Sequence, residues 1–127
     1  VLAATHSFAA LLLAVMAAGA PHYPLADLLG VAAIPARFDA VLFVLIGIAI
    51  STQPLMYGMT RQLVDAQNAG KALSAINLAF FLGAALMQSA TGVVATIFGL
   101  PAVLLFMAAT LIVGTVAFLA FTQPSKS

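Results

Sequence analysis

The chain contains no cysteine and very little charge. The absence of thiols excludes disulfide bonds, thiolate metal sites and a cysteine nucleophile, and it leaves the redox compartment undecided. Charged residues make up 6% of the sequence, whereas a soluble domain carries roughly 25%. Because so few charges cannot cover a surface that faces water, we expect a lipid bilayer to surround much of this chain.

The charged residues that are present exclude further functions. They are the acids Asp27, Asp39 and Asp65 and the bases Arg37, Arg61, Lys71 and Lys126. They form no basic cluster, so nucleic acid is not an expected partner. His6 and His22 lie far from any acid at ligand spacing, so we expect no metal site. The sequence holds no catalytic triad and no glycine-rich phosphate loop, so we expect neither an enzyme nor a cofactor.

Hydrophobic residues make up 65% of the sequence, with a mean hydropathy of +1.22. Turn residues and charges divide the chain into four apolar runs, at approximately residues 2–20, 38–59, 72–97 and 101–121. A helix of about 20 residues crosses a hydrocarbon core of ~30 Å, and the runs lack the alternation of membrane strands. We therefore expect residues 1–127 to form a single all-α, polytopic unit with about four membrane-spanning helices.

The first apolar run has a second interpretation as a signal peptide, with Ala18-Gly19-Ala20 as a small-residue cleavage site. No basic residue precedes the run, and Pro21 stands where cleavage would occur. Both features favour a membrane-spanning helix.

The basic residues predict the orientation of the four spans. Arg61, Lys71 and Lys126 fall on one side of the membrane and Arg37 on the other. Because cytoplasmic loops carry an excess of Lys and Arg, we expect both termini and the loop with Arg61, Asp65, Gly70 and Lys71 to be cytoplasmic. These charges would set topology and anchor helix ends, or they would gate the protein by pairing with Asp65.

Polar residues are concentrated in the second and third runs. In the second, Pro54 removes a helical hydrogen bond and clashes with the Ile50 carbonyl, so we expect a kink there. Gln53 and Tyr57 lie four residues apart and share a helix face. The pattern is typical of a helix that lines a cavity, and equally of a proline kink whose polar neighbours satisfy its own backbone.

The third run carries a stripe of residues at spacings of three and four: Ser74, Asn77, Phe81, Ala84 and Gln88. Asn77 and Gln88 lie about 16 Å apart along the predicted helix. The stripe either faces a solute path or forms hydrogen bonds between helices, and two amides on one face favour the path. Another face carries Ala75, Ala79 and Gly83, a pattern that lets helices pack closely.

The stretch from Gly70 to Gly92 resembles a segment of the major facilitator superfamily. In that family a glycine and a basic residue open helix eleven, which is rich in Ala, Gly, Asn and Gln, and here Gly70-Lys71 precede such a helix. The motif Phe98-Gly99-Leu100-Pro101-Ala102 is similar to the short outer turn into helix twelve. Residues 2–59 match the family in hydropathy and topology more than in motif.

The resemblance implies that the four helices correspond to helices nine to twelve of a secondary transporter. Gln53, Tyr57, Asn77 and Gln88 would then line the C-terminal half of a path for a small solute, which the sequence does not identify. A full member has about twelve helices and works by alternating access, so the remaining N-terminal part is an implied partner. The alanine-rich, cysteine-free composition favours a bacterial cytoplasmic (inner) membrane. Since no charge lies deep in a span, an ion-coupling site is not expected in this part.

A second hypothesis is a complete small four-helix membrane protein that acts as a homo-oligomer or as a structural subunit of a membrane complex. The small-residue face at Ala75, Ala79 and Gly83 would then be the subunit interface. Reading the frame upstream of Val1 separates the two hypotheses, because a transporter requires roughly eight further apolar segments there.

Overall fold

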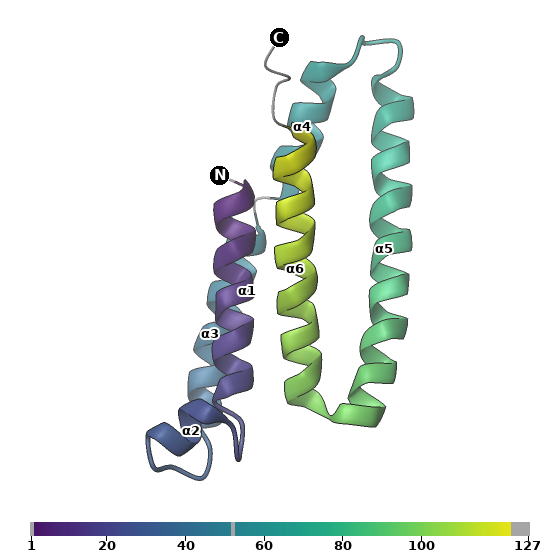
Figure 1. Ribbon diagram of the computed structural model, residues 1–127. Coiled ribbons are helices and arrows are strands. Elements are labelled where there is room, and N and C mark those ends of the chain that lie inside the picture. The colour runs from purple at the N-terminus through teal and green to yellow at the C-terminus, as the bar shows by residue number, and fades with distance from the viewer. Residues whose placement is uncertain (1, 52, 123–127) are drawn as a thin grey trace.

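The structure is a computed structural model that describes residues 2–51 and 53–122; the side chains of Gln53 and Thr122 lie outside the description. It is all-α, as the sequence predicted. In chain order the elements are α1 (Leu2–Ala18), α2 (Pro24–Leu28), α3 (Ala36–Ile50), α4 (Gln53–Leu63), α5 (Ala69–Phe98) and α6 (Leu100–Thr122) (Figure 1).

Three stretches of the described chain are long and apolar enough to cross a membrane. They are Ala36–Leu63, which comprises α3 and α4, then Ala69–Phe98 and Leu100–Phe121. The first helix, α1, is equally apolar but has 17 residues, which corresponds to about 25 Å of rise. The predicted second, third and fourth spans are therefore present as candidate spans, and the first run forms a shorter apolar helix.

The packed core lies between α1, α3 and α6. Alanines 9, 10 and 17 of α1 are almost completely buried, and they contact a cluster that includes Leu42 and Ile46 of α3. From α6, Leu104 and Ala108 join the same cluster. Small side chains allow helix backbones to approach closely, which is the usual way that helices associate in lipid. Accordingly α1 contacts both α3 and α6 extensively.

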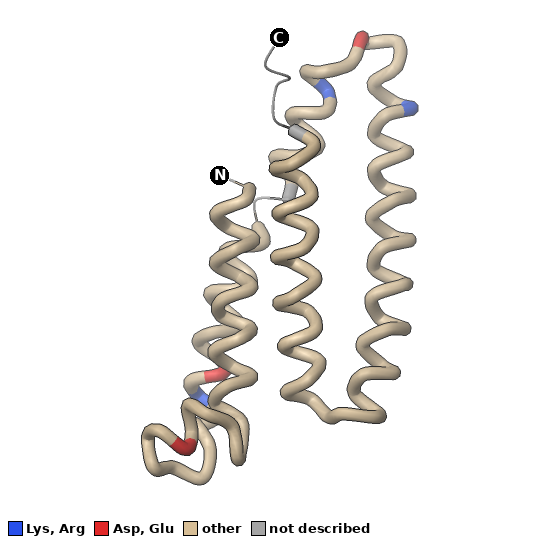
Figure 2. The backbone as a smooth tube through the Cα atoms, viewed as in Figure 1, with Lys and Arg blue, Asp and Glu red and all other residues tan. Residues whose placement is uncertain are grey.

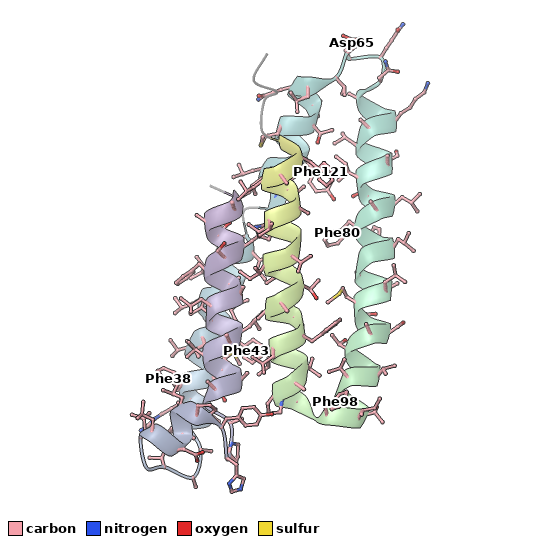
Figure 3. All side chains as sticks on the ribbon, viewed as in Figure 1. Phe38, Phe43, Asp65, Phe80, Phe98 and Phe121 are labelled. Atoms are coloured by element: carbon pink, nitrogen blue, oxygen red, sulfur yellow. The ribbon has the colours of Figure 1, made fainter. Side chains whose placement is uncertain are left out.

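The helix α5 stands outside this core. None of its residues is buried, and the helices that contact it are α6 and α4. Figure 1 shows α5 at one side of the molecule, joined to α6 by a tight turn at one end and to α4 at the other. In Figure 3, Phe98 marks the first of these ends and Asp65 the second.

A single residue, Gly99, connects α5 to α6. Its φ of 81° and ψ of 177° lie in a region that is essentially restricted to glycine. The Gly99 N–H donates a 3.0 Å hydrogen bond to the Ala95 carbonyl, which satisfies the end of α5. Pro101 follows in the first turn of α6, where its missing N–H costs nothing. A short turn, which the motif at residues 98–102 led us to expect, is present, but it consists of Gly99 alone because α6 already begins at Leu100.

The second predicted span comprises two described helices, α3 and α4, on either side of Thr52, which lies outside the description. Helix α3 ends at Ile50, and α4 includes Pro54 as its second residue. The end of α3 coincides with the carbonyl that Pro54 would otherwise meet in a continuous helix. The Ser51 hydroxyl donates a 2.6 Å hydrogen bond to the Ile48 carbonyl, which satisfies one acceptor of the last turn. The two halves have different partners, since α3 contacts α1 and α4 contacts α5.

The loop predicted from Arg61 to Lys71 is shorter in the structure. Helix α4 continues through Arg61 to Leu63, and α5 begins at Ala69, so Gly70 and Lys71 lie in its first turn. The connection is residues 64–68 and contains Asp65. The difference arises because the polar residues of this segment are compatible with helix ends, where N–H and C=O groups require polar surroundings.

The charged residues gather at two opposite ends of the molecule. Figure 2 shows one group around the α4–α5 connection and a second around α2 and the start of α3. The first group contains Arg61, Asp65 and Lys71, and the second contains Asp27, Arg37 and Asp39. The described parts of the helices that lie between these two ends contain no Asp, Glu, Lys or Arg. This distribution is typical of helices that cross a bilayer.

Candidate functional site

The candidate site is centred on a hydrogen bond between α4 and α5. The Tyr57 hydroxyl donates to the Asn77 side-chain oxygen over 2.6 Å. Tyr57 is half-buried and Asn77 is exposed. Two of the four residues predicted to line a solute path are therefore brought together from segments twenty positions apart.

The local sequence explains how Tyr57 reaches α5. Helix α4 contacts α5, whereas α3 contacts α1. Pro54 fits the first turn of α4, where a missing N–H is tolerated. Tyr57 follows one turn later and meets Asn77, which lies on the third turn of α5.

The other two predicted path residues are not joined to this pair. Gln88 is exposed on α5 about 16 Å along the helix from Asn77, on nearly the same face. Gln53 is the first residue of α4, and its side chain lies outside the described residues. The structure thus supports one cross-helix contact and leaves the continuous path as a prediction.

The exposure of this face has an energetic consequence. An amide without a hydrogen-bond partner is costly in hydrocarbon, and polar groups at membrane depth usually face protein or a water-filled cavity. Asn77 has Tyr57 as its partner, but the exposed Gln88 side chain makes no hydrogen bond within the described part of the chain. If α5 spans a bilayer, this face needs water or further protein against it.

The small-residue face of α5 is also uncovered. Ala75, Ala79 and Gly83 are all exposed. A Cβ added at Gly83 would meet nothing within 4 Å, so no described helix uses this close-packing surface. Two roles were predicted for α5, to line a solute path and to pack against another helix. Both faces are exposed, so both roles stay predictions.

The charged residues at the α4–α5 end have separate positions. Arg61 is exposed in the last turn of α4, which places a positive charge where the helix dipole favours it. Asp65, Gly70 and Lys71 are exposed as well. Gating by pairing with Asp65 stays a prediction, as does the role of these residues in setting topology.

Within residues 2–51 and 53–122, no group of three or more His, Asp or Glu residues is placed to hold a metal ion. His6 uses its Nδ1 atom in a 2.7 Å contact with the Leu2 carbonyl, so the ring is engaged with its own helix.

The chain matches no known protein-family model, no curated protein and no solved structure. The resemblance of residues 70–102 to the major facilitator superfamily is therefore an expectation from sequence alone. The functional assignment has to come from the geometry of α4 and α5.

Proposed function

We propose that this chain is the C-terminal portion of a secondary transporter of the major facilitator type. It would move a small solute across a bacterial cytoplasmic membrane by alternating access. The observation that carries the proposal is the Tyr57–Asn77 hydrogen bond between α4 and α5. It joins two polar side chains beside a helix, α5, that has no buried residue. Such a pair is the kind of surface that lines a path between two halves of a transporter.

The packing of the helices supports the same proposal. The core of α1, α3 and α6 provides a fixed support, while α4 and α5 present polar residues on its flank. The described spans hold no ionisable residue at depth, so this part would recognise a solute through hydroxyl and amide hydrogen bonds. Any coupling to protons or sodium would then come from the other half.

The orientation belongs to the proposal as well. We place both termini and the α4–α5 connection in the cytoplasm, because Arg61, Lys71 and Lys126 outnumber Arg37 on that side. The start of α1 and the end of α6 both lie toward the end of the molecule that carries this connection (Figures 1 and 2).

The test has a genetic and a functional part. The frame upstream of Val1 is sequenced, and roughly eight further apolar segments are expected. In the resulting full-length protein, Asn77→Leu and Gln88→Leu should each lower uptake or efflux of the transported solute, measured in vesicles, at unchanged protein levels. The matched control combines Asn77→Leu with Leu78→Asn, which moves the amide one position off the stripe, and it should lower transport as Asn77→Leu alone does. If both leucine variants transport normally, the polar stripe does not line a solute path and its role is structural.

A second candidate function is supported by the uncovered small-residue face. A homo-oligomer would bury Ala75, Ala79 and Gly83 against the same residues of another copy. Since the chain has no cysteine, Ala79→Cys provides a single reporter. Rapid disulfide formation in native membranes, with none for a Val113→Cys control on α6, would favour this candidate over the transporter.

A further inference from the structure

A groove runs along the outside of the core between α1, α4 and α6. It consists of two adjoining cavities of about 260 and 540 Å³. Both are lined by Leu2, Ala3 and Phe118, so the cavities meet at the start of α1 and the last turns of α6. Neither cavity includes Tyr57 or Asn77, so the groove is separate from the candidate path.

The lining of the groove lacks free polar groups over most of its length. The hydroxyl of Thr110 donates to the Phe106 carbonyl over 2.9 Å, and that of Thr115 donates to the Leu111 carbonyl over 2.8 Å. The His6 ring is engaged with the backbone of α1. Because both hydroxyls and the Nδ1 atom of His6 are engaged within their own helices, and most other lining side chains are apolar, the surface is mainly hydrocarbon and suits an apolar chain.

The length of the groove matches one leaflet of a bilayer. Along α6 the lining extends from Thr110 to Leu119, which corresponds to about 14 Å of helical rise. Half of a hydrocarbon core of ~30 Å is about 15 Å. The groove therefore starts near the centre of the predicted span and ends near its boundary.

One end of the groove is polar. Gln62 lines the larger cavity, and Arg61, which is not part of the lining, precedes it in the last turn of α4 and is exposed. A guanidinium and an amide supply several N–H donors for phosphate oxygens. The opposite end, at Thr110, lies in the apolar middle of α6. This asymmetry is that of a phospholipid, with its phosphate at the interface and its chain at depth.

We propose that the groove between α1, α4 and α6 binds an acyl chain of a membrane phospholipid, with the phosphate headgroup at Gln62 and Arg61. The site requires that the helices lie in a bilayer, and it does not depend on solute transport. Gly114 has a specific part, because a Cβ added there would meet nothing within 4 Å and the groove occupies that space. A larger side chain at this position would extend into the groove.

The first test is native mass spectrometry of the purified chain in detergent with added phosphatidylglycerol. The unmodified chain and a Gly92→Phe control on α5 should each retain one lipid. Gly114→Phe should weaken binding by at least about tenfold, the loss expected when about two methylene groups lose their burial. Equal lipid retention by the two variants would overturn the proposal. The proposal would also be overturned if the unmodified chain bound a second copy of itself instead of lipid and Gly114→Phe dissociated that dimer. The groove would then be a subunit interface.

A second measurement does not depend on the folding of Gly114→Phe. The chain has no tryptophan, so Phe118→Trp introduces one fluorophore into the groove, and Phe98→Trp places a control at the far end of α5. One equivalent of phospholipid with brominated acyl chains in detergent should quench the first and not the second. Arg61→Gln should lower the affinity for the phospholipid and leave that for diacylglycerol unchanged. Equal quenching at both positions would exclude a specific site.

Discussion

The Tyr57 hydroxyl and the Asn77 side-chain oxygen lie 2.6 Å apart and join α4 to α5. This contact is a side-chain hydrogen bond between two different helices, whereas the hydroxyls of Ser51, Thr60, Ser89, Thr91, Thr96, Thr110 and Thr115 donate to carbonyls of the preceding turn. It ties the half-helix that follows Pro54 to the helix with no buried residues. The position of α5 is therefore set by this hydrogen bond together with its contacts with α6 and α4.

The first prediction concerns the energy of this hydrogen bond. Tyr57→Phe and Asn77→Leu should each lower the free energy of unfolding, and the double variant should cost less than the sum of the two. Hydrogen bonds between helices in membrane proteins couple by ~0.6 kcal/mol on average and up to ~1.7 kcal/mol. The measurement is a double-mutant cycle by denaturant unfolding in micelles.

Tyr23 provides the control for this cycle. It is the other tyrosine of the chain and precedes α2, far from Asn77 in the fold. Tyr23→Phe combined with Asn77→Leu should be additive. Strict additivity of Tyr57→Phe with Asn77→Leu would mean that the contact contributes nothing to stability.

The second prediction concerns the turn between α5 and α6. Gly99→Ala should destabilise the protein by about 1–3 kcal/mol, because alanine is strained at the Gly99 backbone conformation. Gly92 lies within α5 with open space at its Cβ position, so Gly92→Ala should be neutral or stabilise by up to about 1 kcal/mol. Thermal unfolding of the two variants in the same detergent gives opposite signs if the turn requires glycine. A Gly99→Ala variant as stable as the unmodified chain would contradict this account.

The outline of the fold could be predicted from sequence because its signals are local. The apolar runs mark the candidate spans, Gly99 and Pro101 mark the turn, and Pro54 marks the division of the second run. Each of these depends on the backbone chemistry of one or two residues. The ends of α4 and α5 were less predictable, since polar residues such as Arg61 and Lys71 are accepted both in loops and in terminal helical turns.

The arrangement of the helices could not be predicted in the same way. Alanine is common throughout the chain, and nothing local distinguishes Ala17, which is completely buried in the core, from Ala79, which is exposed on α5. For Tyr57 and Asn77, the sequence predicted only that each lies on a polar helix face, and it did not predict the contact between them. Their pairing depends on how α4 lies against α5, which is a property of the tertiary structure.

The third prediction tests the core against the uncovered helix. Ala17 is completely buried, so Ala17→Leu overpacks the core. Overpacking of this kind lowers the free energy of unfolding by typically about 1–3 kcal/mol. Ala79→Leu makes the same chemical change on α5, where the side chain is exposed, and should leave the stability of the monomer within about 0.5 kcal/mol. Denaturant unfolding of both variants in micelles is the measurement. Equal destabilisation would show that α5 is packed against something as tightly as α1.

The fourth prediction tests the orientation in the membrane. Asp65→Cys reports on the α4–α5 connection, and Asp27→Cys reports on α2 at the opposite end of the molecule. The chain has no cysteine of its own, so each variant carries one thiol. If basic residues hold the α4–α5 connection in the cytoplasm, a membrane-impermeant maleimide should label Asp27→Cys in intact cells and reach Asp65→Cys only after permeabilisation. The reverse pattern would invert the topology, and labelling of both thiols in intact cells would mean that the two ends of α3–α4 do not lie on opposite sides of a bilayer.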